Sequence, residues 1–198
     1  MKVTMLGHSA IAVDAPAGRF VIDPGGFTDP SCLDSADAVL LTHAHADHLD
    51  VEAVRDCGLP VWDTQETVDA VGHGTAVRAG ESFEVLGIKV QAVGGLHEEI
   101  HPAIPRPENV GFFFGGVLHP GDQWVHVEGV ELLFLPIAAP WVRGADAADY
   151  AMTIGARTVV PIHDAVLSDV GKQLTDGMLQ KAGVSGYRRL AVGESVEA

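Results

Sequence analysis

The chain has 198 residues, of which 47% are hydrophobic and 20% are charged, a composition that provides a substantial core and excludes large-scale disorder. Its formal net charge of −15 at pH 7 and its scattered Lys and Arg residues disfavour a nucleic-acid-binding groove. The N-terminus shows no signal-peptide pattern, and no apolar run is long enough to span a membrane. We therefore expect one cytoplasmic domain over residues 1–198 that has no membrane or nucleic-acid partner.

Most of the first half is predicted to form short strands. Apolar runs at residues 2–6, 10–14 and 19–22 alternate with turn-forming residues, and the continuous apolar run at 38–41 is typical of a buried strand. A helix is expected at 49–57, because Gly58 and Pro60 end it. It is followed by a short strand near Val61, a short helix at 66–71, and antiparallel strands at 76–78, 82–86 and 88–93.

The second half changes from strands to helices. Residues 95–109 contain three prolines and few apolar residues, so a loop is expected there. Strands are predicted at 110–114, 117–119 and 130–135, then a helix at 145–154, a strand at 158–162, a helix at 171–182 and a last strand at 188–192. Two strand-rich stretches that each lead into helices indicate an α/β (α+β) fold, in which two packed sheets carry helices outside.

Four potential metal ligands follow the predicted strand 38–41 within six residues: His43, His45, Asp47 and His48. Residues two apart in an extended stretch point the same way, so His43 and His45 can bind one ion. Asp47 and His48 change direction as the chain turns into a helix and can bind a second ion. Asp47 alone would pass as a helix N-cap, but four such residues at this spacing are rare outside a metal site. Imidazole and carboxylate ligands without thiolates suit Zn²⁺, and also Mn²⁺ or Fe.

This segment matches the signature His-x-His-x-Asp-His, and the chain resembles the metallo-β-lactamase superfamily from Leu6 to His163. The resemblance implies a His, an Asp and a last His after later strands, and His97, Asp122 and His163 fill these positions in order. Three further segments resemble the subgroup of ascorbate-phosphate lactonase: Gly7-His8-Ser9, Ile22-Asp23-Pro24 and Asn109-Val110-Gly111-Phe112.

The resemblance implies a four-layer αββα sandwich that holds two divalent cations, with Zn²⁺ preferred over Mn²⁺ or Fe. By the same resemblance, the first cation takes His43, His45 and His97, the second takes Asp47, His48 and His163, and Asp122 bridges them. The implied reaction is hydrolysis of an ester, lactone or phosphodiester in a small, anionic molecule by a hydroxide shared between two cations. Asp122 and Asp47 are the expected catalytic carboxylates, as the bridge and as the group that orients the hydroxide. The oligomeric state stays open, although homo-oligomers are common among such small proteins.

Several further residues have two possible roles. His8 is expected either near the site or as a turn residue, and His119 either beside a ligand or packed at a strand end. Asp23 is expected either as a hydrogen-bond partner of a ligand histidine or as a turn residue. Trp141 is expected in the pocket or the core. The sequence His97-Glu98-Glu99-Ile100-His101 matches a zincin motif, but neighbouring glycines and prolines disfavour the helix that this motif needs. An iron oxidoreductase of the persulfide dioxygenase kind and a non-catalytic metal-binding protein remain alternatives.

Overall fold

The computed structural model describes residues 1–198 and has two β-sheets. The first contains β1 (Lys2–Gly7), β2 (Ala10–Ala15), β3 (Gly18–Ile22), β4 (Ala38–Leu40), β5 (Val61–Asp63), β6 (Thr75–Ala76) and β13 (Ser195–Glu197), in the order β13-β1-β2-β3-β4-β5-β6. The second contains β7 (Ser82–Val85), β8 (Ile88–Leu96), β9 (Glu108–Phe114), β10 (Val117–His119), β11 (Leu132–Pro136) and β12 (Thr158–Ile162), in the order β12-β11-β10-β9-β8-β7.

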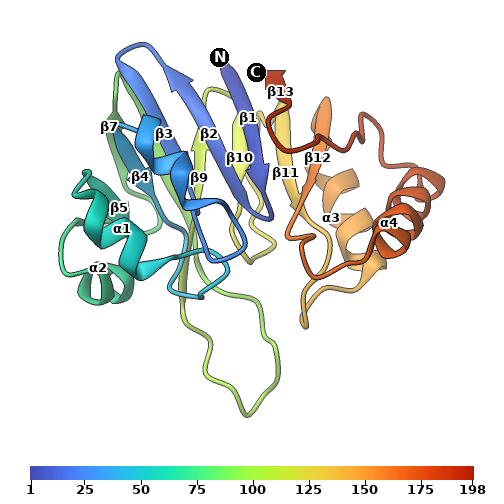
Figure 1. Ribbon diagram of the computed structural model, residues 1–198. Helices are drawn as coiled ribbons and strands as arrows, with labels where there is room; N and C mark the ends of the chain where they lie inside the picture. The colour runs from blue at the N-terminus through green and yellow to red at the C-terminus, as the bar shows by residue number, and fades with distance from the viewer.

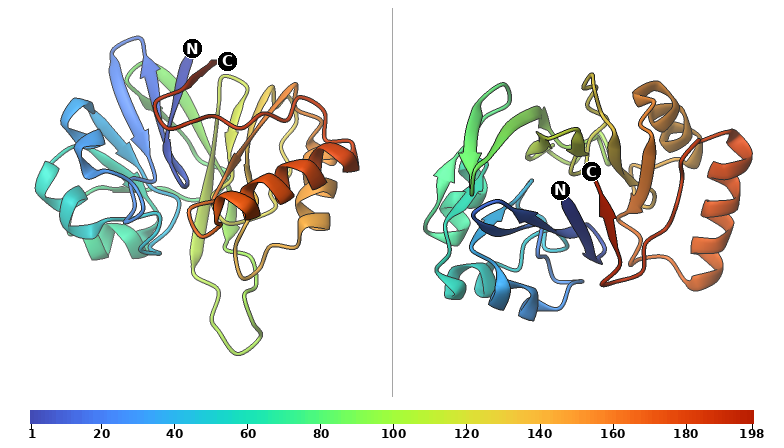
Figure 2. Two further views of the ribbon diagram at one scale, coloured as in Figure 1. Left: turned by 45° about the vertical axis from the view of Figure 1, so that its right-hand side comes forward. Right: turned by 90° about the horizontal axis from the view of Figure 1, so that it is seen from above.

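Helices cover the outer face of each sheet and complete the predicted αββα sandwich (Figures 1 and 2). The 3₁₀-helix η1 (Pro30–Ser35) and the helices α1 (Val51–Cys57) and α2 (Gln65–Val71) lie on the first sheet. The helices α3 (Gly144–Ile154) and α4 (Asp169–Ala182) lie on the second sheet. No helix combines the length and the apolar content that a membrane crossing needs.

Central strands are apolar throughout because both of their faces are buried. In β11, Leu132 and Phe134 point into the apolar cluster between the two sheets, whereas Leu133 and Leu135 point into the cluster beneath α3 and α4. The same alternation in β4 places Leu40 between the sheets and Val39 under α1. A period of two residues with both faces covered explains why the continuous apolar run at 38–41 predicted a buried strand.

The directions of the strands place the loops that carry the predicted metal ligands at one edge of the sandwich. In the first sheet β3, β4, β5 and β6 are parallel, and in the second sheet β10, β11 and β12 are parallel. The strand β8 is antiparallel to β9, which is antiparallel to β10, so β8 and β10 run the same way. The long loop between β8 and β9 extends beyond this edge, and both chain ends lie side by side at the opposite edge (Figure 1).

Two details differ from the sequence prediction. The short β6 pairs with β5 in parallel rather than antiparallel with the strands that follow it. The strand expected at 188–192 is absent, and the first sheet is closed by β13 instead. Leu190 is buried in the core between the sheets, which explains the apolar pattern, but the Arg189 side chain is held by Asp176 and Asp164 beside α4. The backbone pairs with β12 only at a single bridge between Tyr187 and Val159, where the Arg188 N–H donates to the Val159 carbonyl oxygen (2.9 Å), so residues 188–192 form no strand.

Candidate metal centre

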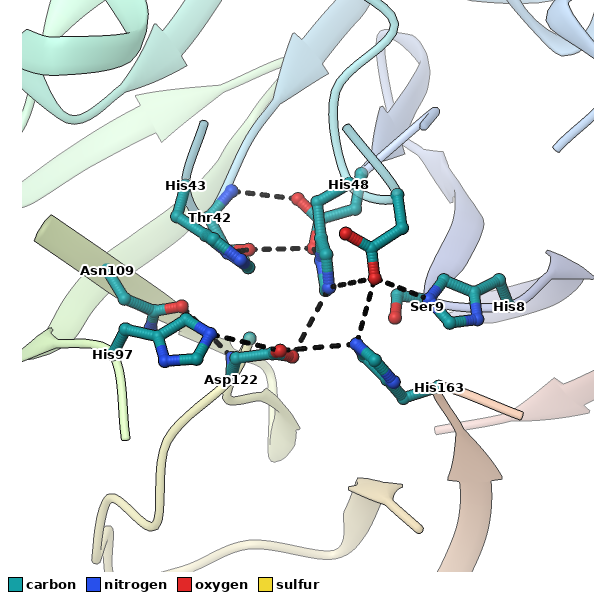
Figure 3. Close-up of polar contacts among 12 residues, drawn as sticks. His8, Ser9, Thr42, His43, His48, His97, Asn109, Asp122 and His163 are labelled. Atoms are coloured by element: carbon teal, nitrogen blue, oxygen red, sulfur yellow. Dashed lines mark hydrogen bonds and ion pairs between the residues drawn. The ribbon is translucent and has the colours of Figure 1, made fainter. Parts of the chain in front are cut away.

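The seven predicted ligands come from four loops, which follow β4, β8, β10 and β12. Figure 3 shows five of them, His43, His48, His97, Asp122 and His163, pointing toward one another. Together with His8, the seven residues form two groups, and within each group the potential ligand atoms all lie within 4.8 Å of one another. The first group is His43, His45, His97 and Asp122, and the second group is His8, Asp47, His48 and His163.

Asp122 lies between the two groups. Its Oδ2 is 3.3 Å from Nε2 of His97 in the first group and 3.2 Å from Nε2 of His163 in the second. Its Oδ1 is 3.2 Å from Nε2 of His48. The indole N–H of Trp141 donates a hydrogen bond to Oδ2 over 3.2 Å. A carboxylate that reaches both groups through two oxygens has the geometry of a bridging ligand.

Asp23, at the end of β3, fixes the histidines that follow β4. Its Oδ1 accepts a hydrogen bond from the Thr42 backbone N–H (2.7 Å) and its Oδ2 accepts one from the Thr42 hydroxyl (2.8 Å). Oδ2 also lies 2.7 Å from Nδ1 of His48, so that nitrogen carries the hydrogen. The Thr42 hydroxyl donates its hydrogen to Asp23, so its oxygen accepts a hydrogen bond from Nδ1 of His43 (2.9 Å). When neutral, both imidazoles therefore have an unprotonated Nε2.

Backbone carbonyls orient the two histidines of the second sheet in the same way. Nδ1 of His97 donates to the Glu98 carbonyl oxygen (2.6 Å), and Nδ1 of His163 donates to the Ala138 carbonyl oxygen. A carbonyl oxygen can only accept, so Nε2 of each ring is again left with a lone pair. Metal-bound imidazoles usually donate their other N–H to such acceptors.

The residues present fit a metal centre, as the unpaired atoms show. Nε2 of His43, His48 and His163 and Oδ1 of Asp122 are buried, and while the imidazoles are neutral these atoms have no hydrogen-bond partner. A buried polar atom without a partner costs about 1–3 kcal/mol, so several at one place need a compensating ligand. Imidazole nitrogens and carboxylate oxygens are the donors that Zn²⁺, Mn²⁺ and Fe accept.

The electrostatics of the second group show an excess of negative charge. Burial by itself would lower the pKa of His163, but hydrogen bonds to Asp122 and Asp47 raise it to about 9. Burial likewise opposes the charge on His48, yet Asp122 and Asp23 hold its pKa well above the usual value. Burial lowers the pKa of His43 well below its usual value, and burial also lowers that of His45. The carboxylates thus favour protonation of the histidines in the second group, and bound metal cations can replace these protons.

Close packing fixes the loops that carry the ligands. A Cβ on Gly25 would lie 2.0 Å from the Asp47 carbonyl oxygen, so the turn after β3 can touch the metal loop only with glycine there. Asn109 clamps the Asp122 loop, because its Oδ1 accepts from the Asp122 N–H (3.0 Å) and its Nδ2 donates to the Pro120 carbonyl (3.1 Å). Sequence reasoning assigned no role to Asn109 or to Thr42, although Asn109 stands in a segment that carried the resemblance.

Two further histidines approach the site with the opposite tautomer. Nδ1 of His8 accepts from the Ala165 backbone N–H (3.3 Å), so its Nε2–H donates to Asp47 Oδ2 (3.1 Å). Nε2–H of His119 donates to the Ser9 carbonyl (2.8 Å), and its Nδ1 accepts from Gly121 (3.3 Å). His8 thus supports Asp47, and His119 holds the end of β10 against the β1–β2 turn.

The zincin motif is not formed. Residues 97–101 are not helical, and His101 is exposed in the long loop, where its Nδ1 accepts from the Ala103 N–H (3.1 Å). His97 joins the first group while His101 stays outside it. The glycines and prolines around this segment had indicated that a helix could not form.

Comparison with known proteins agrees with this architecture. The family model described as "Beta-lactamase superfamily domain" matches residues 2–163. A protein of Mycobacterium tuberculosis is 30% identical over 96% of this chain and 96% of its own length, and a metal-dependent hydrolase of Geobacillus thermodenitrificans is 29% identical over 100% of both chains. The solved structure of a metallo hydrolase from the archaeon Ignicoccus hospitalis superposes with a TM-score of 0.73 at 22% identity, covering 98% of this chain and 97% of the other. The chain therefore belongs to the metallo-β-lactamase superfamily.

Proposed function

We propose that this chain is a single domain that binds two divalent cations and hydrolyses an ester, lactone or phosphodiester bond in a small molecule. The first cation would be held by His43, His45 and His97, the second by Asp47, His48 and His163, and Asp122 would be shared. The observation that carries this proposal is the position of Asp122, whose two oxygens lie 3.2–3.3 Å from imidazole nitrogens of both groups. Zn²⁺ is the first candidate because every donor is nitrogen or oxygen.

Two such cations, when bound, lower the pKa of a shared water towards about 7 and polarise the oxygen of the scissile group. Asp122 would hold the shared position, and Trp141 fixes its carboxylate. Asp47 is the more accessible carboxylate, with 23% of its side chain exposed against 3% for Asp122. Burial would raise the pKa of Asp47, but its hydrogen bonds to His163 and His8 keep it well below the usual value. Asp47 is therefore ionised and can accept a hydrogen bond from the attacking water.

The substrate class is supported by the surroundings of the first group. A hollow beside His45 is lined by Glu66, Arg106 and Glu108, so one cation stands there beside two carboxylates. The Arg106 Nε–H donates to the His97 carbonyl oxygen, and its remaining N–H groups offer a partner for an anionic group on a small molecule. The lactone is included because the segments around His8, Asp23 and Asn109 resemble those of ascorbate-phosphate lactonase.

Metal content tests this proposal. The protein is purified without added metal and analysed by plasma mass spectrometry beside Asp122→Ala, His163→Ala and the control His126→Ala, which removes an exposed histidine outside both groups. We expect about two equivalents of Zn²⁺ or Mn²⁺ in the wild type and the control, and about one or fewer in the other two variants. Absence of tight binding even after reconstitution would refute the dinuclear site. One equivalent of iron would favour the oxidoreductase alternative instead.

A further inference from the structure

A second hollow, of about 550 Å³, lies beside Asp47 and His163, and its lining is largely apolar. The apolar lining includes Ile137, Ala138, Ala139, Val142, Val166 and Leu167. No Lys or Arg is among the lining residues, and the only charged or titratable side chains there are Asp47 and His163 of the second group. The volume falls in the range of small-molecule pockets, which is about 300–1,000 Å³.

The wall of this hollow is fixed relative to the candidate ligands. The segment between β11 and α3 supplies most of the lining, and its Ala138 carbonyl accepts the Nδ1–H of His163. The same segment ends at Trp141 and Val142, and Trp141 donates to Asp122. Any group that occupies the hollow would therefore lie at a set position beside the second group, without a rearrangement of the chain.

The two hollows differ in chemistry. The hollow beside His45 is polar and contains Arg106, whereas the hollow beside His163 is apolar and lacks a cation. A carboxylate or phosphate placed in the apolar hollow would be desolvated without a positive partner, which is unfavourable. A hydrocarbon group placed there would instead release water from both surfaces.

We propose that the apolar hollow beside His163 binds an aliphatic group of the substrate, so that the substrates carry a hydrocarbon chain next to the bond that is cleaved. The role of the hollow in catalysis rests on the proposed function, whereas the binding of an aliphatic group in the hollow does not depend on it. Each methylene that enters the hollow tightens binding about fourfold, which corresponds to about 0.8 kcal/mol. The gain ends when the chain fills the hollow and its next methylene reaches water.

Binding of n-alkanoic acids from acetate to octanoate tests the assignment. Calorimetric titration of the Zn²⁺-loaded protein is expected to show affinity that rises about fourfold per methylene and then levels off. Ala139→Leu narrows the hollow and removes the gain for the longer acids. Val166→Ser changes a side chain that is 59% exposed, so it leaves folding intact, and it weakens octanoate binding several-fold while acetate binding stays the same.

Val170→Ser is the matched control, because Val170 is 65% exposed, stands four residues along the chain, and does not line the hollow. The assignment would be overturned if all the acids bound with equal affinity, or if neither Ala139→Leu nor Val166→Ser changed the affinities. Turnover of p-nitrophenyl esters is measured in parallel to separate the two proposals. Affinity that rises with the chain length of the acid, without any turnover, would contradict the proposed function alone. Turnover together with an affinity that does not depend on chain length would contradict the assignment of the hollow alone.

Discussion

Lowering the pH is expected to weaken metal binding at the second group far more than at the first. In the metal-free protein the pKa of His163 is raised to about 9, because its hydrogen bonds to Asp122 and Asp47 outweigh burial. The pKa of His48 is raised as well, since Asp122 and Asp23 outweigh burial. Burial lowers the pKa of His43 in the first group. At pH 7 the imidazoles of His48 and His163 are therefore positively charged, while that of His43 is neutral.

The magnitude follows from proton competition. A cation binds the deprotonated imidazole, so binding at the second group must release the proton of His163. Below a pKa of about 9, each released proton lowers the apparent affinity about tenfold per pH unit. From about pH 8 to about pH 6.5 the second cation should bind about 30-fold more weakly if His163 alone releases a proton, and about 1,000-fold more weakly if His48 does too. Because the pKa values are raised, affinity is lost as the pH falls.

Calorimetric titration of the metal-free protein with Zn²⁺ provides the assay. Repeating the titration in two buffers of different ionisation enthalpy gives the number of protons released in each binding step. We expect one to two protons in the weaker step and fewer in the tighter step, and His163→Ala should abolish the weaker step while the proton release of the tighter step stays the same. Equal proton release in both steps, or affinities that do not change with pH, would refute this account of the two groups.

Other consequences of the structure can be measured as well. His8→Phe removes the donor to Asp47 and should lower kcat about 10–100-fold with little change in KM, whereas His8→Gln should retain part of the activity in steady-state kinetics. Gly25→Ala should lower Tm and metal content because its Cβ would meet the Asp47 carbonyl, while Gly177→Ala, which has open space in α4, should raise the unfolding free energy by about 0.5–1 kcal/mol. Burial and the nearby Asp29 raise the pKa of Cys32 to about 11, so iodoacetamide should label it about 100-fold more slowly in the native protein than in urea, as followed by mass spectrometry.

The sequence predicted the elements better than it predicted the contacts between them. The αββα layers could be foreseen because apolar runs such as 38–41 and 130–135 correspond to strands that are buried on both faces. The expected strand at 188–192 was wrong because burial of Leu190 resembles the pattern of a strand, whereas the backbone pairs with β12 only at the single bridge between Tyr187 and Val159. A hydrophobic pattern records burial and does not record which backbone groups are paired.

The candidate site likewise contains residues that the sequence predicted and contacts that it did not predict. His43, His45, Asp47 and His48 could be read from local spacing, because one loop carries all four. The remaining three candidate ligands are single residues in distant segments, so only the resemblance indicated them, and strands of the second sheet that run in the same direction bring them together. The roles of Thr42 and Asn109 could not be foreseen, since each is defined by hydrogen bonds that cross between segments.

Proximity alone does not separate ligands from supporting residues at this centre, but the hydrogen-bond partners do. His8 lies within 4.8 Å of the other potential ligand atoms of the second group, as close as a ligand would be. Burial lowers its pKa, so at neutral pH its ring carries one hydrogen, and the Ala165 N–H forces that hydrogen onto Nε2, which faces Asp47. His48 and His163 instead direct Nδ1–H outwards to Asp23 and to a carbonyl oxygen. Once the Nε2 protons of His48 and His163 are released, the second group therefore offers two imidazole lone pairs and the Asp47 carboxylate, and His8 serves to hold that carboxylate in place.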